Sequence, residues 1–129
     1  MVDIREQSPQ AMAFVGDAVY TLLIREHIAT DKRQPINKLN QASVKYISAR
    51  GQFMALGLIT EILTEEEQNM VRRGKNASKA SVAKHASVEE YRASTGFECL
   101  LGYLKLTGQD KRIKYLVDYI LENLKFENQ

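Results

Sequence analysis

The sequence predicts an all-α fold, and two observations support that prediction. Helix-capping residues recur along the chain, at Ser8, Thr64, Ser87 and Asp110, and apolar residues follow them at helical spacing. The two-residue turns that join alternating strands into hairpins are missing. We therefore expect a helical bundle of about six or seven helices.

Composition indicates a single domain that spans residues 1–129. The chain is 44% hydrophobic and 26% charged, and no linker or internal repeat divides it. One cysteine excludes an intramolecular disulfide, and two histidines with that cysteine are too few for a typical zinc site. No apolar run approaches the roughly 20 residues of a membrane span, and the polar N-terminus lacks a signal-peptide core, so we expect a cytoplasmic protein.

Local signals predict the helices of the first half of the chain. Ser8 and Pro9 are a typical N-cap and first-turn proline, and they open a helix over residues 9–29. Residues 30–35 form a loop. Residues 36–56 have apolar positions at mixed helical spacings, which favour two helices that end near Gly57; the pattern leaves their boundary open.

Capping boxes predict the helices of the second half. The pattern T-x-x-E at residues 64–67 opens a short helix that Gly74 should close, and S-x-x-E at residues 87–90 opens a longer helix to about residue 106. The stretch TGQD then makes a turn, and Asp110 caps a last helix. That helix carries one apolar stripe, which consists of Ile113, Leu116, Val117, Ile120, Leu121 and Leu124.

Two carboxylates stand in apolar surroundings. Asp17 lies in the run FVGDAVYTLLI, on a mostly apolar helical face that predicts an inward orientation, and Glu98 lies mid-helix in STGFECLLGYLKL. Burial of a carboxylate is costly and raises its pKa unless a cation or hydrogen-bond donors compensate. If the two helices cross at these acids, with Gly16, Gly96 and Gly102 allowing close approach, the pair can bind a divalent cation such as Mg²⁺.

Structural interpretations of the same residues are open. Asp17 could be the N-cap of a helix that begins after Gly16. Glu98 could pair with Arg92 or Lys105 at a solvated edge. The glycines could then mark helix packing alone.

A basic segment, RRGKNASKASVAKH at residues 72–85, contains no acid. Its glycine and small residues predict an extended segment, and clustered cations with short polar donors suit the phosphates of a nucleic-acid backbone. A solvated loop without a ligand is the alternative. The candidate nucleic-acid-binding residues are Arg72, Arg73, Lys75, Asn76 and Lys79.

The stretches AMAFVGDAVY and STGFECLLGYL resemble the two acidic motifs of the ribonuclease III catalytic domain, in the same order and at similar separation. The stretches EEEQNMVRRGKNASKAS and SVEEYRASTGFE, with the short chain, are similar to the Mini-ribonuclease III branch, which lacks a double-stranded-RNA-binding domain. The resemblance implies a ribonuclease III-type helical fold, a homodimer and Mg²⁺-dependent endoribonuclease activity on double-stranded RNA. It makes Asp17 and Glu98 the catalytic residues and metal ligands.

The chain departs from the wider family at two positions. Ordinary ribonuclease III has a further glutamate where this chain has Ala13, and a further aspartate where it has Thr95. Fewer protein ligands should then hold the metal, with waters or RNA phosphates completing its shell. The resemblance also implies products with 5′-phosphate and 3′-hydroxyl ends, and it implies the precursor of large-subunit (23S) ribosomal RNA of a bacterium as the substrate. Ribosomal proteins are further candidate partners.

Two rival functions are compatible with the same residues. One is a catalytically inactive dimeric RNA-binding protein of the same fold, which the two missing carboxylates favour. The other is a helical protein-interaction module in which the acids have structural roles only. For a dimer, Gly102 and the apolar stripe near Tyr20 are candidate interface positions.

Overall fold

The computed structural model describes residues 2–78 and 87–126, which contain six α-helices. They are α1 (Pro9–Asp31), α2 (Ile36–Ile47), α3 (Ala49–Ile59), α4 (Glu65–Ala77), α5 (Val88–Leu106) and α6 (Asp110–Asn123). Two short 3-10 helices, η1 (Ile4–Glu6) and η2 (Thr60–Ile62), precede α1 and follow α3. The described residues contain no strand, which confirms the all-α prediction.

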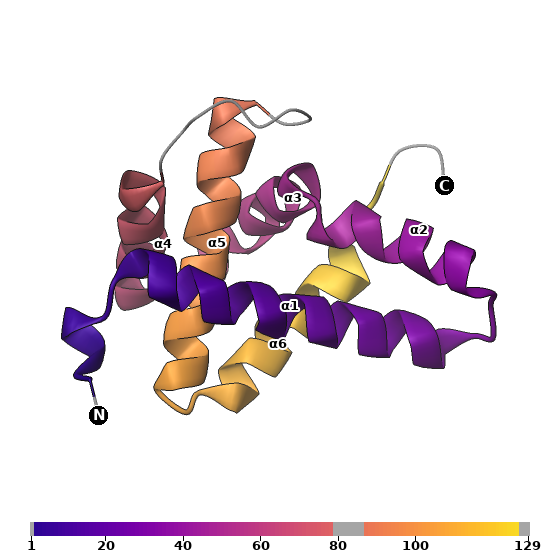
Figure 1. The fold of residues 1–129 in the computed structure, drawn as a ribbon, viewed down its shortest axis with the longest axis horizontal. Coiled ribbons are helices and arrows are strands. Elements are labelled where there is room, and N and C mark those ends of the chain that lie inside the picture. The colour runs from indigo at the N-terminus through magenta and orange to yellow at the C-terminus, as the bar shows by residue number, and fades with distance from the viewer. Residues whose placement is uncertain (1, 79–86, 127–129) are drawn as a thin grey trace.

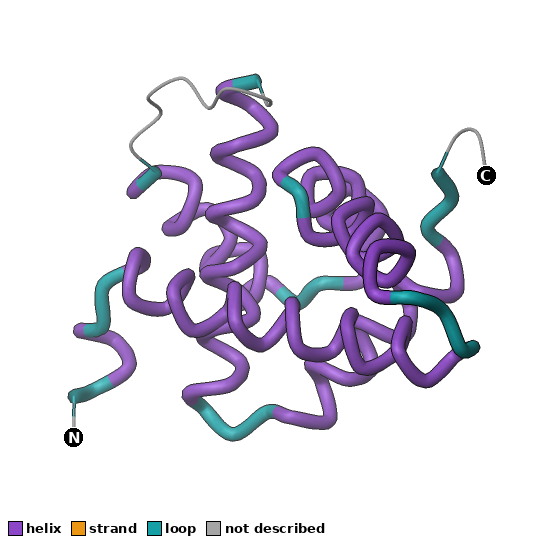
Figure 2. The backbone as a smooth tube through the Cα atoms, turned by 45° about the vertical axis from the view of Figure 1, so that its right-hand side comes forward, coloured by secondary structure: helices purple, strands orange, loops and turns teal. Residues whose placement is uncertain are grey.

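Helix α5 is the centre of the arrangement. In Figure 1 it runs vertically, α1 crosses it at a steep angle, and α4 and α3 lie on either side of it. Short loops join most of the successive helices (Figure 2). Helices α1 and α5, which carry Asp17 and Glu98, pack directly against each other.

The core is densest around α5. From Phe97 to Leu104 every residue of that helix is buried except Glu98, which is half-buried. The ring of Phe97 meets the ring of Tyr20 from α1 edge to face, with centroids 4.8 Å apart. Cys99, the only cysteine of the chain, is fully buried on the same helix. A helix that is apolar on nearly all sides is a core helix, so a charged group in it requires an explanation.

The predicted helix starts are largely confirmed. The Ser8 hydroxyl accepts from the Ala11 amide at 3.0 Å, and both predicted capping boxes form. Three boundary predictions are wrong. Helix α3 continues through Gly57, which does not end it. Helix α4 continues through Gly74, and Asp110 is the first residue of α6 instead of its cap.

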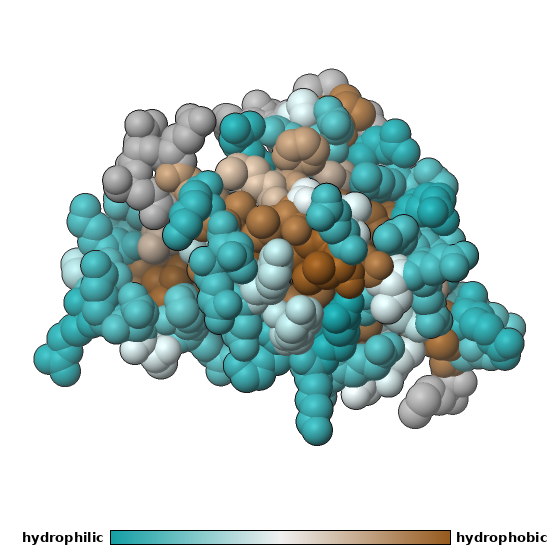
Figure 3. Space-filling view, turned by 180° about the vertical axis from the view of Figure 1, so that it is seen from behind, coloured by the Kyte–Doolittle hydropathy of each residue, from teal (hydrophilic) through white to brown (hydrophobic). Residues whose placement is uncertain are grey.

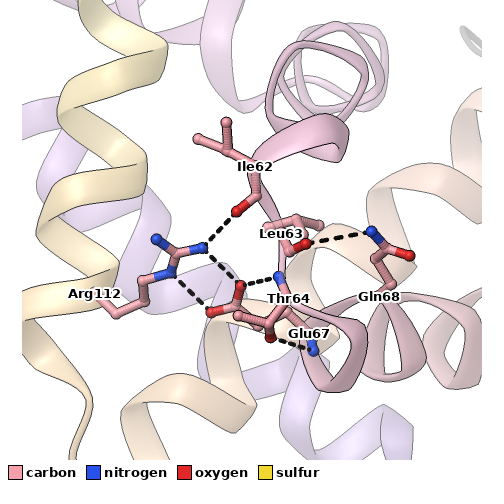
Figure 4. Close-up of polar contacts among 6 residues, drawn as sticks. All are labelled: Ile62, Leu63, Thr64, Glu67, Gln68 and Arg112. Carbon is pink, nitrogen blue, oxygen red and sulfur yellow. Dashed lines mark hydrogen bonds and ion pairs between the residues drawn. The ribbon is translucent and has the colours of Figure 1, made fainter.

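One ion pair attaches the last helix to α4 (Figure 4). Arg112 of α6 donates to the two Glu67 carboxylate oxygens at 2.9 and 2.8 Å and to the Ile62 carbonyl oxygen at 2.8 Å. The same Glu67 carboxylate accepts from the Thr64 amide in the capping box. Burial opposes the charge of Glu67, but these hydrogen bonds outweigh it and lower its pKa. A single carboxylate therefore caps α4 and holds α6.

The surface is mostly hydrophilic, with an apolar area on one face. Seen from behind (Figure 3), hydrophobic residues reach the surface near the middle of the molecule, and hydrophilic residues cover most of the area around them. In the described part of the chain, no helix has both the length and the apolar character needed to cross a membrane.

Candidate active site

Helices α1 and α5 cross with their backbones in direct contact. A Cβ atom added at Gly16 would lie well within 3.0 Å of the Glu98 carbonyl oxygen, and one at Gly102 would lie well within 3.0 Å of the Met12 carbonyl oxygen. Side chains do not tolerate such approaches, so this crossing requires glycine at both positions. Because Asp17 directly follows Gly16, the crossing brings the two predicted carboxylates together.

Asp17 and Glu98, here called the acid pair, lie within hydrogen-bonding reach of each other. Asp17 is exposed and Glu98 is half-buried. Burial first, and then the neighbouring Asp17 carboxyl, raise the pKa of Glu98 from its usual 4.5 to about 8. A half-buried acid whose charged form is disfavoured, beside a second carboxyl, forms a site that a bound cation would stabilise.

Several structural interpretations of these residues are wrong. Asp17 does not point into the core, and it is no N-cap because α1 runs unbroken through it. Glu98 pairs with neither expected cation, since Arg92 donates to a backbone carbonyl of α4 and Lys105 pairs with the first residue of α6. Gly96 does not serve this crossing, because it packs against α4.

The donor set of the acid pair fits Mg²⁺. Among the described residues, no group of three or more His, Cys, Asp or Glu side chains gathers to hold a metal ion. The positions one turn before the two acids hold Ala13 and Thr95, which supply no carboxylate. Mg²⁺ prefers oxygen ligands, takes one or two protein carboxylates and usually keeps several waters. Two carboxylates, one exposed and one half-buried, therefore suit Mg²⁺ better than zinc, which favours a closed set of nitrogen and sulfur ligands.

A third polar side chain, Gln52, reaches Glu98. Gln52 lies in the first turn of α3 and is only 3% exposed. Its Nε2 donates to Glu98 Oε2 at 3.3 Å and to the Ile47 carbonyl oxygen at 3.0 Å. Sequence reasoning missed this residue, although a signal was present: Gln52 interrupts the apolar run GQFMALGLI just as Asp17 interrupts its own apolar run.

The predicted nucleic-acid-binding residues lie largely on a helix, not on an extended segment. Helix α4 continues to its end at residue 77 because Gly74 serves packing: a Cβ there would lie 2.7 Å from the Gly96 Cα on α5. Arg72, Lys75 and Asn76 occupy one side of α4 at helical spacing, and we call them the basic face. Arg72 and Asn76 are exposed, and Lys75 is half-buried.

The other two predicted residues do not belong to the basic face as described. Arg73 is half-buried and donates to the Gln7 carbonyl oxygen at 3.1 Å, which ties the N-terminal segment to α4. Lys79 lies outside the described residues. Near the end of α4, the Gln10 amide of α1 donates to the Ala77 carbonyl oxygen at 3.1 Å. The basic face and Asp17 therefore lie on helices that contact each other.

Helix α1 also presents apolar side chains to solvent. Phe14 is 81% exposed and Leu22 is 58% exposed, with exposed Ala18 midway between them. These three residues recur every fourth position and form one stripe, the α1 stripe. Of the sequence-based candidates for a dimer interface, Gly102 is buried inside the chain; the other was the apolar stripe near Tyr20, and Tyr20 itself is buried too.

The chain is similar to ribonuclease III proteins in sequence and in fold. A family model described as the Ribonuclease III domain matches residues 10–109, which include both acids. A Mini-ribonuclease 3 of Thermoanaerobacter sp. (strain X514) is 45% identical over 86% of this chain and 78% of the relative. A Mini-ribonuclease 3 of Streptococcus pneumoniae is 40% identical over 96% and 98%, respectively. A crystal structure of a Fusobacterium nucleatum protein matches with a TM-score of 0.85 at 27% identity, over 95% of this chain and 98% of that chain.

Proposed function

The chain belongs to the Mini-ribonuclease III branch of the ribonuclease III family, and we propose that it is a Mg²⁺-dependent endoribonuclease that hydrolyses phosphodiester bonds in double-stranded RNA. The observation that most supports this proposal is the acid pair at the α1–α5 crossing. Asp17 and Glu98 come from the two stretches that resemble the family's acidic motifs, and the fold holds them together at the surface.

The acid pair provides oxygen ligands of unequal exposure. When bound there, Mg²⁺ would acidify a water molecule and neutralise charge on the scissile phosphate. Asp17 is exposed and thus accessible to RNA, whereas half-buried Glu98 belongs to the core helix. The water oxygen forms a bond to phosphorus while the bond from phosphorus to the 3′-oxygen breaks. A proton ends on that 3′-oxygen, which leaves 5′-phosphate and 3′-hydroxyl ends.

We assign the RNA contacts to the basic face of α4. Arg72 and Lys75 offer cations, and Asn76 offers amide donors, on a helix that packs beside α5 and touches α1. Such groups bind phosphates and 2′-hydroxyls of A-form RNA across its minor groove. We include Lys79 in this set from its place in the basic segment. Arg73 instead supports the helix from its inner side.

We infer a homodimer that forms through the α1 stripe. Exposed apolar side chains such as Phe14 gain free energy when a partner surface removes them from water. Asp17 lies one turn from Phe14, so a two-fold contact along this stripe would bring the two acid pairs to one shared face. Two sites on one face suit cuts in the two strands of a duplex.

Within the cell, the proposed substrate is the precursor of 23S ribosomal RNA, in the bacterial cytoplasm, where ribosomal proteins could present it. The support for this substrate is the resemblance to the Mini-ribonuclease III branch. The chain's own residues support only the more general chemistry, which is a cation-dependent cut in a polyanion.

The test is cleavage of a long perfect RNA duplex, with Mg²⁺ or with EDTA, resolved on a gel. Wild type, Asp17→Asn and Glu98→Gln are compared with Asp31→Asn, a matched control at the exposed end of α1. Wild type and the control should cut only with Mg²⁺. The two site variants should fold and bind RNA but not cut, because they keep the shape of the side chain and lose its charge.

Comparable cleavage by all four proteins would contradict the assignment of the acid pair. Salt-sensitive binding without cleavage, of this duplex and of a structured ribosomal precursor, would favour the inactive RNA-binding alternative. Neither binding nor cleavage would favour the protein-interaction module.

A further inference from the structure

We propose that Gln52 is a positioning residue: it orients the Glu98 carboxylate and, through it, sets the affinity of the acid pair for a divalent cation. This inference rests on the proposed function, since it names a role within the same site. It concerns a residue on α3, a helix that contributes no carboxylate to the acid pair.

The hydrogen bonds of Gln52 link the Glu98 carboxylate to the backbone at the corner between α2 and α3. The Gln52 Nε2 group donates both to Glu98 Oε2 and to the Ile47 carbonyl oxygen, at 3.3 and 3.0 Å. A glutamate side chain has three rotatable bonds, so an unrestrained Glu98 would sample several positions of its oxygens. The amide restricts Glu98 Oε2 relative to the backbone of the α2–α3 corner. This geometry resembles the outer-shell hydrogen bonds that orient ligands at metal sites.

The corner that carries Gln52 is itself tightly built. The Ser48 hydroxyl accepts from the Gly51 amide at 3.1 Å and caps α3. A Cβ atom added at Gly51 would lie 2.6 Å from the Tyr46 carbonyl oxygen and still closer to that of Lys45. The backbone directly before Gln52 is therefore packed closely against the backbone at the end of α2, and this packing sets where the Gln52 side chain begins.

Burial of a polar side chain such as Gln52 costs free energy unless its polar atoms are paired. Its side-chain Oε1 is buried and has no hydrogen-bond partner among the described residues. An apolar side chain of similar length would avoid the desolvation of both amide atoms. Among the described residues, Glu98 is the one side chain to which the Gln52 amide donates; its other acceptor is a backbone carbonyl. The amide is thus most readily explained by its contact with Glu98.

A neutral donor is the suitable group at this place. A carboxylate in place of Gln52 would add a third negative charge beside two acids, and an ammonium group would compete with the cation for Glu98. An amide orients one carboxylate oxygen and leaves the net charge of the acid pair unchanged. It also favours the charged form of Glu98, in the direction opposite to burial.

The test measures binding of Mn²⁺ alone, without RNA, by titration calorimetry. Mn²⁺ accepts the same oxygen ligands as Mg²⁺. Gln52→Met removes the amide and keeps the length of the side chain. Gln68→Met is the matched control, since Gln68 also donates to a backbone carbonyl at a helix corner (Figure 4) but donates to neither acid. We expect Gln52→Met to weaken Mn²⁺ binding about 10-fold and the control to leave it unchanged.

A second readout separates positioning from general stability. In cleavage assays, Gln52→Met should need a higher Mg²⁺ concentration for half-maximal rate, while the KM for RNA stays at the wild-type value. Wild-type Mn²⁺ affinity and an unchanged Mg²⁺ requirement in Gln52→Met would overturn the inference and leave the proposed function intact. If wild type bound no Mn²⁺ in a manner sensitive to Asp17→Asn, the proposed metal site itself would fail.

Nuclear magnetic resonance of the wild-type chain keeps the inference testable if Gln52→Met does not fold. The side-chain amide signals of Gln52 should shift on addition of Mg²⁺, and the shift should disappear in Glu98→Gln. Unmoved Gln52 signals, in a protein whose Asp17 and Glu98 signals respond to Mg²⁺, would overturn the positioning role.

Discussion

Helix α5 packs against α1 and against α4 through glycines, and the residues beside the two crossings carry opposite charges. Against α1, Gly16 and Gly102 leave no space for a Cβ atom beside backbone carbonyls. Against α4, a Cβ at Gly74 or Gly96 would meet its nearest atoms at 2.7 Å, so that approach is less extreme. The first crossing carries the acid pair and the second carries the basic face. The comparison teaches that close helix packing at glycines, used twice on one helix, can set the positions of both a pair of carboxylates and a group of basic residues.

The largest effect should come from filling the tighter crossing. Gly102→Ala places a methyl group against the Met12 backbone, so α1 and α5 must separate. Overpacking typically costs about 1–3 kcal/mol and more where backbone blocks relaxation. We expect a loss of about 3 kcal/mol or more in the free energy of unfolding. Urea denaturation followed by circular dichroism measures it.

Gly74→Ala provides the comparison at the other crossing. Its new methyl group meets a cysteine side chain and the Gly96 Cα, so its cost should be smaller than that of Gly102→Ala. Equal costs at the two positions would mean that the crossings are equally tight, contrary to the geometry.

The next effect concerns the acid pair and pH. The pKa of Glu98 rises from 4.5 to about 8 on folding, so the folded chain keeps a proton that the unfolded chain releases above pH 4.5. Without divalent cations, stability should therefore fall as pH rises from about 4.5 to 8, by a few kcal/mol in all. Glu98→Gln cannot ionise and should lose this dependence.

Unfolding in EDTA at pH 5 and pH 8 measures the pH effect. Wild type should lose stability between the two, and the variant should lose clearly less. Parallel losses in the two proteins would show that other groups carry the dependence. Added Mg²⁺ should raise the stability of wild type at pH 8, because binding to the folded state alone stabilises it.

A smaller effect is expected for two neighbouring arginines of α4, whose removal should change different properties. Arg72→Ala removes a cation of the basic face, and the salt slope of RNA affinity should decrease in magnitude by about 1. Arg73→Ala removes the hydrogen bond to the Gln7 carbonyl, so it should lower stability by about 1 kcal/mol and leave the salt slope unchanged. Fluorescence anisotropy at several salt concentrations distinguishes them. A reversed pattern would place Arg73 in the interface instead.

The smallest effect tests whether glycine matters through packing. Gly57 is exposed in α3, and a Cβ added there meets no atom within 4 Å. Gly57→Ala should therefore stabilise the chain by about 0.5–1 kcal/mol, because alanine favours helix and restricts the unfolded chain. Thermal unfolding measures the gain. A loss of stability would contradict the view that only the glycines at the crossings need to lack a side chain.

Helix starts could be predicted from the sequence because their causes are local. The Ser8 cap and the two capping boxes depend on residues three positions apart. Gly74 was predicted as a helix end because a glycine can serve either a left-handed terminus or a close contact. The contact that decides between them is on α5, which a reading of local sequence does not contain.

The candidate site residues differ in the same way: local sequence indicates some of them, and only contacts distant in sequence identify the others. Asp17 and Glu98 stood out because each is charged within an apolar run, and family resemblance joined them. Gln52 has no such resemblance, and its contact with Glu98 spans 46 positions of the chain. The inward role of Arg73 depends on a backbone carbonyl 66 positions away. The chemical character of the candidate site could therefore be predicted from residue types, whereas the direction in which each side chain points required the fold.

Cys99 makes the α4–α5 crossing observable by chemical labelling. Its thiol is fully buried on α5, and a Cβ at Gly74 of α4 would lie 2.7 Å from the Cys99 Cβ. Burial raises its pKa to about 11, so little reactive thiolate exists at neutral pH. Alkylation of Cys99 in the folded chain then requires α4 and α5 to separate, so the alkylation rate reports how often they do. An RNA that binds across α4 should lower the alkylation rate.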